Sequence, residues 1–574
     1  MLKLLKLLGK YKKETVLGPL LKMFEALLEL FVPLVIASLI DKGINGGLGT
    51  PYITKMCLIL VAFGVLGLLF SVTAQFFAAK AATGVVKHIR LNLFTHIQKL
   101  GYPELDKLGK ATMITRLTND VNQVQNGINL ALRLLLRSPF VVFGAMIMAF
   151  FVDKDLALIF VVAIPVLAIV VFTIMLVSIP MYKKVQQKLD TVLSSTRQTL
   201  TGARVIRAFC KEQDEEDRFK DQNNDLVKMQ VLVGRISQLM NPLTYVIINL
   251  AIAFLIYKGA ISVGAGVISQ GALVALYNYM SQILVELIKL ANLIISITRA
   301  FACGNRIQTV LELKLSQING TDRNFDFTAP AVEFKDVSLV YGSNREPSLE
   351  HITFTVNKGE TVGIIGGTGS GKTSVVNLIP RFYDAFDGTV KVFGKDVKEY
   401  DFDFLRSIIG IVPQKAELFN GTIRDNIKWG NPEANDEQIF EALKKAQALD
   451  IVTSKKEGLD AIVEQYGRNF SGGQKQRLTI ARALLKNPEI LIFDDSASAL
   501  DYQTDAKLRK AIKEMGEKTV FIVSQRTSSL LHADKIIVLD DGQIEAMGIH
   551  KELLENSPLY SEIHYQQVGG AKSE

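Results

Sequence analysis

Long apolar runs confined to the first half of the chain most constrain what it can fold into. Residues 57–69, 139–151, 156–177 and 243–255 are almost continuously hydrophobic. A hydrocarbon core about 30 Å thick requires ~20 mostly apolar residues in helical form, and these runs with their flanks reach that length. Mean hydropathy is +0.24 and hydrophobic residues make up 49% of the chain, both high for a water-soluble protein. Roughly the first half therefore indicates a membrane domain.

Basic residues set the expected orientation of this domain. Spans are predicted near residues 16–41, 56–80, 127–152, 156–181, 239–260 and 272–298. Seven Lys and Arg residues lie in the connector 80–120 and eleven in the connector 183–235, whereas the three opposite turns hold only Lys42, Lys55, Lys154 and Lys258. Basic connectors stay on the cytoplasmic side. Both termini are therefore predicted to be cytoplasmic. The net charge of +8 is explained without a nucleic-acid partner.

The N-terminal segment is basic at helical spacing. Lys3, Lys6, Lys10 and Lys13 alternate with leucines, which predicts an amphipathic helix over residues 1–13 on the membrane surface. A cleaved signal peptide is the alternative. It is disfavoured because Pro19, Lys22, Glu25 and Glu29 interrupt the apolar stretch that follows.

Two long proline-free stretches predict helices that extend beyond the membrane. No proline lies between Pro51 and Pro103, or between Pro180 and Pro242. Fifty residues of continuous helix would extend about 75 Å, more than twice the hydrocarbon thickness. We expect one reversal at Gly101-Tyr102-Pro103 and the other within residues 209–219. Flexible loops are the alternative, but structureless loops of ~50 residues are uncommon.

The second half of the chain has the composition of a globular α/β domain. We expect an all-α transmembrane domain with six helices at 14–310, a linker at 311–330, an α/β domain at 331–565 and a polar tail at 566–574. Three cysteines at positions 57, 210 and 303 are too widely spaced for a disulfide framework or a metal cluster.

A glycine-rich loop after an apolar strand predicts a phosphate site. The loop follows the strand-like segment 361–365 and opens a helix, the context in which backbone N–H groups surround phosphate oxygens. Lys372 is expected to neutralise the β- and γ-phosphates of ATP, and Thr373 to ligate Mg²⁺. The predicted ATP-binding residues here are Gly366, Gly367, Thr368, Gly369, Ser370, Gly371, Lys372, Thr373 and Ser374.

Two later segments strengthen the ATP prediction. Residues 490–493 form a buried apolar strand that ends at Asp494, which would carry a carboxylate to the magnesium ion. Phe470 precedes a serine- and glycine-rich segment that can cap a helix and bind phosphate. That segment consists of Ser471, Gly472, Gly473 and Gln474.

With these motifs in this order, the whole chain resembles the ATP-binding cassette family. The resemblance implies that residues 471–474 cap the γ-phosphate of ATP held by an opposite subunit. It implies that Tyr341 stacks on adenine and that Gln414 contacts magnesium or the attacking water. It also implies that the loop 498–501, with Asp501, crosses the dimer interface. Phe470 stands where the family usually has leucine.

Two departures from the family pattern fall in the same composite site. Asp495 stands where the family has a catalytic glutamate, and it is one methylene shorter. Misplacing a reacting group by about 1 Å can cost ~100-fold in rate. Gln525 stands where the family has a switch histidine, and glutamine cannot carry imidazolium charge. Tolerated variation is one interpretation. The sharper interpretation is a slow site at Lys372, with Ser471 serving a competent site on another chain.

The membrane half resembles the six-helix domain of exporter-type cassette transporters. TRLTNDV at 115–121 and GARVIRAF at 202–209 match segments common there. The resemblance implies a dimer of two halves in a cell membrane, compatible with a bacterial inner membrane. The paired departures favour a heterodimer whose partner carries the glutamate and the histidine. The implied function is ATP-driven outward transport of small amphipathic compounds, of the multidrug type.

Ionisable residues inside the predicted spans are candidates for a substrate cavity. Charges at membrane depth are costly and face an interior or one another. Glu25/Glu29 and Arg133/Arg137 are each spaced i, i+4, which predicts a shared helix face. Glu286 in the sixth span is the leading candidate for contacting a cationic substrate. Salt bridges between helices, or snorkelling to the membrane interface, are the alternatives.

Other functions remain on the same scaffold. A lipid or peptide translocator is the first alternative, although no N-terminal peptidase segment precedes the first span. An ATP-gated channel or regulatory subunit is the second, since a slow ATP site also suits gating. Six spans exclude a water-soluble cassette of DNA repair or translation.

Overall fold

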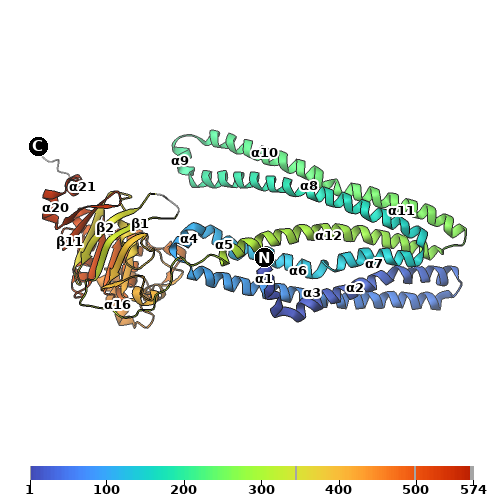
Figure 1. The fold of residues 1–574 in the computed structure, drawn as a ribbon, viewed down its shortest axis with the longest axis horizontal. Coiled ribbons are helices and arrows are strands. Elements are labelled where there is room, and N and C mark those ends of the chain that lie inside the picture. Colours follow the sequence, from blue (N-terminus) through green and yellow to red (C-terminus); the bar gives the residue numbers. More distant parts are fainter. Residues whose placement is uncertain (1, 343–345, 497–499, 569–574) are drawn as a thin grey trace. The chain divides into compact units, whose positions relative to one another are not determined.

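The computed structural model describes residues 2–342, 346–496 and 500–568, and it divides into two compact units (Figure 1). The helical unit comprises Met1–Gln98 and Ala111–Leu313. The α/β unit comprises Lys99–Lys110 and Lys314–Glu574. The short segment Lys99–Lys110, at the expected first reversal, therefore belongs with the α/β unit. The predicted domain bounds at 310, 330 and 565 stay predictions.

Long helices make up the helical unit, as predicted. Within the described residues, six helical stretches are long and apolar enough to cross a membrane: Lys3–Asn45, Gly49–Lys99, Lys110–Val152, Lys154–Thr201, Glu212–Gly264 and Gln270–Leu311. Three of them are single uninterrupted helices, and the two longest are α3 (Gly49–Lys99, 51 residues) and α8 (Lys154–Thr201, 48 residues). At about 1.5 Å per residue each exceeds 70 Å, so both extend well past a bilayer core.

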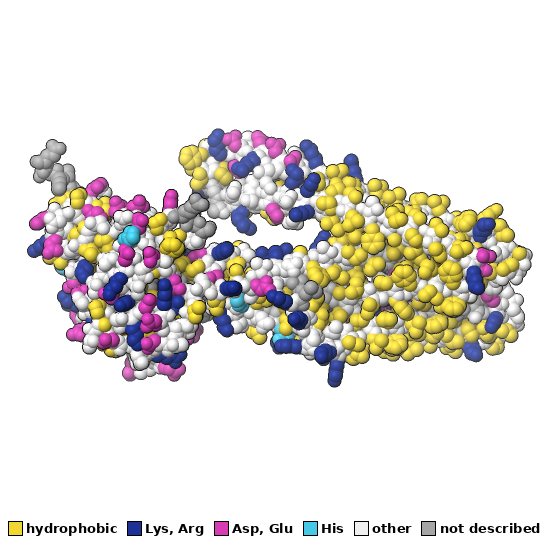
Figure 2. All heavy atoms as spheres, viewed as in Figure 1, with side chains coloured by type: hydrophobic (Ala, Val, Ile, Leu, Met, Phe, Trp, Pro, Cys, Tyr) yellow, Lys and Arg dark blue, Asp and Glu magenta, His cyan; other side chains and the backbone are white. Residues whose placement is uncertain are grey.

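The rest of this unit consists of shorter helices and helical segments. Hydrophobic side chains cover much of the surface of this unit, and charged side chains gather near its ends (Figure 2). The other elements are α1 (Leu2–Leu5), η1 (Lys6–Tyr11), α2 (Lys12–Ser38), η2 (Leu39–Asn45), α5 (Lys110–Thr115), η3 (Arg116–Asp120), α6 (Val121–Leu134), α7 (Arg137–Val152), α9 (Ala203–Ala208), α10 (Glu212–Gln238), α11 (Met240–Gly264) and α12 (Gln270–Leu311).

Residues 2–13 are helical but not one regular α-helix, and the predicted place of this segment on the membrane surface stays a prediction. A short α-helix, α1, is followed by the 3₁₀ segment η1, and α2 already begins at Lys12. Tyr11 leaves helical geometry, with φ −120° and ψ 39°. Its ring lies against Gly84 of α3, where an added Cβ would come within 2.2 Å of Tyr11 Cζ. Packing against α3 thus replaces a regular helical turn.

The predicted span at 127–152 lies within the helical stretch Lys110–Val152, but it contains a break. Helix α6 ends at Leu134 and α7 begins at Arg137, so Arg133 and Arg137 do not share one uninterrupted helix face. Pro139 lies in the first turn of α7. A proline lacks the N–H that would bond the preceding turn and clashes with that carbonyl, which breaks a helix at this point.

The two reversals differ in how well the sequence located them. The first is where it was predicted, since α3 ends at Lys99 and α4 (Tyr102–Leu108) follows. The second begins earlier than residues 209–219, because α8 ends at Thr201, Gly202 is its C-cap, and the short α9 intervenes before α10. Glycine is a poor helix former and ends α8 there.

A six-stranded sheet organises the α/β unit. Its order is β12-β11-β3-β10-β9-β6, with β12 antiparallel at one edge and the other neighbours parallel. Its central strands are buried on both faces, which explains their continuous apolar sequences. The strands are β3 (Thr361–Gly366), β6 (Ile409–Val412), β9 (Ile490–Asp494), β10 (Thr519–Val523), β11 (Lys535–Asp540) and β12 (Gln543–Gly548).

A second, antiparallel sheet has the order β2-β1-β4-β5 and shares a hydrophobic core with β3 and α13. A separate core joins α15 to α18 with one side of the large sheet. These elements are β1 (Val332–Leu339), β2 (Leu349–Val356), α13 (Lys372–Leu378), β4 (Asp387–Val392), β5 (Lys395–Asp396), α14 (Phe402–Ser407), β7 (Gly421–Thr422), α15 (Ile423–Lys428), α16 (Asp436–Lys445), α17 (Leu449–Thr453), β8 (Ile462–Val463), α18 (Gly472–Leu485), α19 (Tyr502–Lys513), α20 (His550–Asn556) and α21 (Pro558–Val568).

Candidate nucleotide site and membrane charge network

The glycine-rich loop connects the central strand β3 to α13. Gly369 and Gly371 have φ angles of 91° and 93°, which side chains rarely adopt. A Cβ added to Gly371 would also lie only 2.6 Å from a methyl carbon of Leu349. The structure therefore places residues 366–371 in a tight loop that requires glycine, and residues 372–374 in the first turn of α13.

Lys372 is buried at the end of this loop. Its Nζ donates to the carbonyl oxygen of Gly366 at 3.0 Å and to the Ser370 hydroxyl at 3.3 Å. Burial lowers the pKa of this ammonium, although Asp495 and Asp494 oppose the shift. The acceptors that this buried ammonium bonds among the described residues are neutral, so it would gain from a phosphate anion.

Thr373 and Asp494 place two oxygen donors side by side. The Thr373 hydroxyl donates to the Asp494 carboxylate oxygens at 2.9 and 3.2 Å. Burial raises the pKa of Asp494, and the charge of the neighbouring Asp495 adds to that shift. A hydroxyl and a carboxylate are the oxygen ligands that Mg²⁺ prefers, so this donor set fits that ion.

Asp495 follows β9 directly and adopts a φ of 45°. Few residues other than glycine tolerate this left-handed conformation, and aspartate is among them. Its backbone N–H donates to the carbonyl of Val523 at 3.0 Å, which joins the ends of β9 and β10. The Gln414 amide, after β6, donates to the Asp495 carboxylate at 3.3 Å. Asp494, Asp495 and Gln414 therefore meet at one edge of the sheet.

Gln525 lies just beyond β10, the strand between β3 and β9. Val523, two residues earlier, pairs with Ile364 on one side and with Asp494 on the other. The topology therefore brings Gln525 to the sheet edge that carries the glycine-rich loop and Asp494. Gln525 is exposed, whereas its neighbour Ser524 is buried.

Tyr341 connects this site to residues that sequence analysis did not identify. Its hydroxyl donates to Ser374 at 3.0 Å, and its ring packs edge-on against Tyr383, with centroids 4.9 Å apart. Tyr383 in turn donates to Asp106 of α4 at 2.6 Å, and Tyr102 stacks on Phe382 at 4.5 Å. Burial and the Asp106 contact raise the pKa of Tyr383. Only the aromatic content of residues 382–383 could have indicated this role.

The serine- and glycine-rich segment begins α18. Ser471 is the N-cap: its hydroxyl accepts from the Gln474 N–H at 3.3 Å, and its own N–H donates to the Gln474 side chain at 3.0 Å. This reciprocal pair is a capping box, so the expected helix start is present. Phe470 is buried in the helical core, and Lys455 Nζ lies 4.8 Å from its ring centroid. The core therefore accommodates phenylalanine at the position where the family usually has leucine.

The predicted interface loop is only partly described. Ser498 and Ala499 lie outside the described residues. Asp501 is the N-cap of α19 and accepts from the Thr504 N–H at 2.8 Å. A dimer contact of Asp501 stays a prediction.

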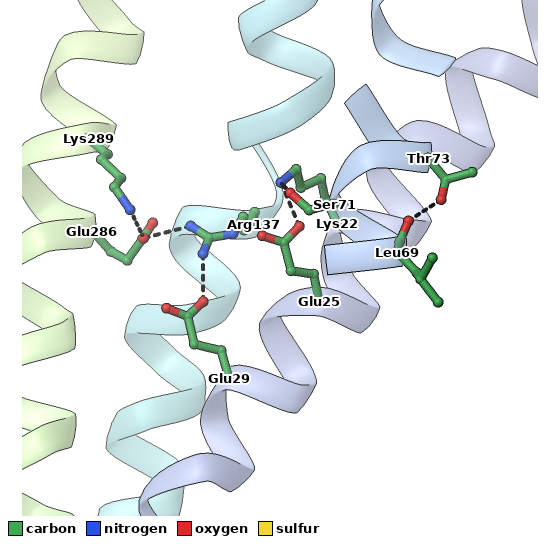
Figure 3. A network of polar contacts seen from close by, with 9 residues as sticks. All are labelled: Lys22, Glu25, Glu29, Leu69, Ser71, Thr73, Arg137, Glu286 and Lys289. Carbon is green, nitrogen blue, oxygen red and sulfur yellow. Dashed lines mark hydrogen bonds and ion pairs between the residues drawn. The ribbon is translucent and has the colours of Figure 1, made fainter. Parts of the chain in front are cut away.

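Four charged residues within the membrane spans form a network centred on Arg137, and Lys22 and Glu25 form a separate ion pair (Figure 3). Arg137 of α7 donates to Glu286 of α12 and to Glu29 of α2, each at 2.6 Å. Lys289 lies 2.8 Å from Glu286, and Lys22 lies 2.5 Å from Glu25. The network contains two cations and two carboxylates, and the pair contains one of each, so the formal charges cancel in both.

Glu286 is held on every side within this network. It is 2% exposed, and the Ser138 hydroxyl donates to its second carboxylate oxygen at 2.8 Å. The side chain of Glu29, by contrast, is 40% exposed. Glu29 lines a groove of about 300 Å³ beside α12 and another of about 680 Å³ beside α3. The contacts therefore favour the salt-bridge interpretation for Glu286.

Comparisons with known proteins agree with this architecture. A family model for the ABC transporter transmembrane region matches residues 15–287, and the ABC transporter model matches residues 349–498. An uncharacterized ABC transporter ATP-binding protein of Bacillus subtilis is 34% identical over 578 residues, covering 100% of both chains. One of Mycobacterium tuberculosis is 34% identical over 571 residues, covering 98% of both chains.

Two further similarities concern exporters. The ATP-dependent lipid A-core flippase of Vibrio vulnificus is 27% identical over 561 residues, covering 97% of this chain and 96% of its own. A solved bacterial Atm1-family ABC exporter with ATP bound superposes with a TM-score of 0.80 at 24% identity, covering 99% of both chains. This last likeness shows that the fold is of the exporter type.

The fold and the site define a nucleotide-binding ATPase domain joined to a multi-pass membrane domain. The chain belongs to the ABC transporter family, with one transmembrane region and one cassette. Its cassette binds nucleotide and couples ATP hydrolysis to transport across a membrane.

Proposed function

We propose that this chain is one half of an ATP-driven exporter that moves small amphipathic compounds outward, of the multidrug type. The observation that carries the proposal is the larger groove of the helical unit. Its wall is mostly apolar, with Leu60, Phe63 and Leu68 among its residues, and the charged side chains of Glu25, Glu29 and Arg137 interrupt it. Such a wall suits a ligand with an apolar body and a polar or cationic head.

We propose that Glu29, rather than the predicted Glu286, contacts a cationic substrate directly. Glu286 lines the smaller groove, but Arg137, Lys289 and Ser138 occupy its oxygens. A substrate cation would have to displace a buried ion pair to reach it. Glu29 borders both grooves and is partly exposed, so it is the better carboxylate for direct contact, with Glu286 holding Arg137 in place.

The transporter is proposed to be a dimer, and specifically a heterodimer. Asp495 and Gln525 replace the family's glutamate and histidine in this chain's own site. We propose that this site binds ATP and hydrolyses it slowly, while residues 471–474 cap ATP on a partner that carries glutamate and histidine.

The oxygen donors already described would bind magnesium. Thr373 and Asp494 would hold Mg²⁺, with Gln414 next to them, and the ion would neutralise charge on the β- and γ-phosphates. Asp495, bonded to the Gln414 amide, is then the carboxylate placed to orient or deprotonate a water. Its shorter side chain is the physical reason for slow turnover.

The membrane is proposed to be the cell membrane, with both termini cytoplasmic. The basic residues of the two long connectors, seven in 80–120 and eleven in 183–235, support this orientation. Membrane lipids surround the exposed apolar side chains of the spans.

One alternative has a specific observation in its favour. The similarity to lipid A-core flippases supports a lipid translocator on the same scaffold. A peptide translocator or an ATP-gated channel has no comparable support.

Transport by the full-length chain, co-expressed with a candidate partner in inside-out vesicles, tests the proposal. ATP should drive accumulation of a cationic amphipathic dye, and Lys372→Ala should abolish it. Movement of a fluorescent lipid without dye accumulation would favour the translocator. A rate of solute flux far above the rate of ATP hydrolysis would favour the channel.

A further inference from the structure

The C-terminal helix α21 contacts the loop that carries Gln525. The Gln567 side-chain amide donates to the Gln525 carbonyl oxygen at 2.6 Å. The oxygen of the same amide accepts from the Thr527 N–H at 2.9 Å and from the Thr527 hydroxyl at 3.2 Å. One side chain therefore bonds the backbone on both sides of Arg526.

A second residue of α21 supports the same contact. His564 Nδ1 lies 3.0 Å from the Thr527 hydroxyl. Residues three apart lie on one face of a helix, so His564 and Gln567 approach Thr527 together. Thr527 is only 1% exposed, and its polar atoms depend on these partners rather than on water.

Helix α21 is itself fixed to the sheet. Tyr560 is fully buried, its hydroxyl lies 2.7 Å from His550 Nδ1, and the Ser561 hydroxyl donates to the Leu554 carbonyl at 2.7 Å. Tyr560 packs in a cluster with Ile536 and Val538 of β11. The contact from α21 therefore comes from a rigid support.

The other end of the loop is tied to the nucleotide side. The Ser524 N–H donates to the Ile364 carbonyl of β3 at 3.1 Å, and the Arg526 N–H donates to the Ser524 hydroxyl at 2.9 Å. The backbone is thus held at Ser524 by β3 and at Gln525 and Thr527 by Gln567. The exposed Gln525 side chain projects from a loop whose path is fixed on both sides.

We propose that Gln567 is a positioning residue for ATP hydrolysis, and that it sets the placement of Gln525 from the C-terminal helix. The inference rests on the proposed role of Gln525 at the γ-phosphate. It predicts that the C-terminal helix affects the hydrolysis rate without contacting nucleotide. ATP affinity depends on Lys372 and the glycine-rich loop, and it should not change.

Hydrogen exchange of the full-length chain tests the contact itself. In Gln567→Ala, the Thr527 amide loses its acceptor, and its exchange should become roughly 2–10-fold faster, the size expected for one hydrogen bond. Gln566→Ala is the matched control, because Gln566 bonds Glu562 on its own helix. Unchanged exchange at Thr527 in Gln567→Ala would overturn the proposal.

Single-turnover hydrolysis of radiolabelled ATP by the chain purified alone tests the positioning. Gln567→Ala should slow the step about 10-fold, since small misplacements of reacting groups are costly, and should leave ATP affinity unchanged. Gln567→Glu keeps the acceptor for Thr527 and loses the donor to Gln525, so its rate should be intermediate.

The two assays separate this inference from the proposal beneath it. If Gln525→Ala hydrolyses ATP at the wild-type rate, the role of Gln525 fails, whatever the exchange result. If Gln525→Ala is slow but Gln567→Ala hydrolyses normally, the contact is only structural and the inference is overturned. A parallel loss of ATP affinity in Gln567→Ala would also overturn it.

Discussion

The membrane network and the nucleotide site both bury charge, but they compensate it differently. In the network, Arg137 lies between two carboxylates, and Lys289 adds a second cation to Glu286. In the nucleotide site, the Lys372 ammonium bonds neutral oxygens, while Asp494 and Asp495 lie next to each other in the sequence. Burial lowers the pKa of Lys372 and raises that of Asp494.

This difference distinguishes a structural cluster from a ligand site. Charges that cancel within the protein hold helices together. Removing one partner leaves the other charge buried and uncompensated, which is costly. In the nucleotide site the cation lies on the loop and the carboxylates lie at a strand end. They gain most from a ligand whose anion binds the cation and whose cation binds the carboxylates. Nucleotide with its magnesium ion is such a ligand. Each prediction below tests one side of this contrast.

The largest stability effect is expected in the network. Arg137→Met leaves the buried Glu286 with Lys289 as an ion-pair partner and Ser138 as a hydrogen-bond donor, and removing one partner of a buried ion pair costs about 3–5 kcal/mol. The thermal unfolding midpoint in detergent should fall sharply. Arg133→Met is the matched control on the same span and should cost much less. Recovery is expected in Arg137→Met/Glu286→Met, and its failure would contradict the charge-balance account.

A large effect on binding, with little effect on folding, is expected at Lys372. Lys372→Ala removes a charged bond to phosphate, worth about 1.5–3 kcal/mol, so ATP affinity should fall roughly 10–100-fold. Lys444→Ala, on the exposed side of α16, should bind ATP normally. Equilibrium binding of a fluorescent ATP analogue measures both. Equal losses in the two variants would show that net charge, not the loop, determines affinity.

A gain of stability is expected from Asp494→Asn. Because burial raises the pKa of Asp494, the folded state favours the protonated form, and this stability is lost as pH rises through the folded-state pKa. Asparagine removes that loss, so the nucleotide-free variant should unfold about 2 °C higher at neutral pH, as roughly 1 kcal/mol produces. The benefit should shrink toward pH 4. Calorimetry at both pH values checks the sign.

The smallest stability effect is expected at Glu29. Its side chain is 40% exposed, so Glu29→Gln should cost less than about 1 kcal/mol. Transport of a cationic amphipath should nevertheless weaken, with an uncharged analogue unaffected. Glu286→Gln should instead lose more stability than Glu29→Gln and have the smaller direct effect on cation transport. If both variants transport the cation normally, the grooves do not select charge.

The elements around the candidate nucleotide site could be predicted from local sequence, for a physical reason. Residues 366–374 and 471–474 are contiguous, and their backbone geometry demands glycine and a capping serine at fixed positions. The strand ending at Asp494 is apolar because it is buried on both faces. Local chemistry alone therefore indicates these pieces, although their assigned roles still rest on experiment.

The membrane network and the α4 contacts could not be predicted in the same way. Glu29, Arg137 and Glu286 come from three helices, and the i, i+4 spacing of Arg133 and Arg137 was misleading because Pro139 breaks the helix between them. Tyr383 and Gln567 act through tertiary contacts with Asp106 and Thr527, far away in the chain. Pairings of this kind depend on packing, and no local pattern encodes them.

ATP turnover by the full-length chain purified alone tests the central claim most directly, with Asp495→Glu/Gln525→His measured beside it. If two cassettes share each nucleotide and this chain supplies a sound cap but a weak base, the lone chain will turn over slowly. The double variant, with its longer carboxylate and its imidazole, will be at least about 10-fold faster. Robust turnover by the unmodified chain, abolished by Asp495→Asn, would contradict the account.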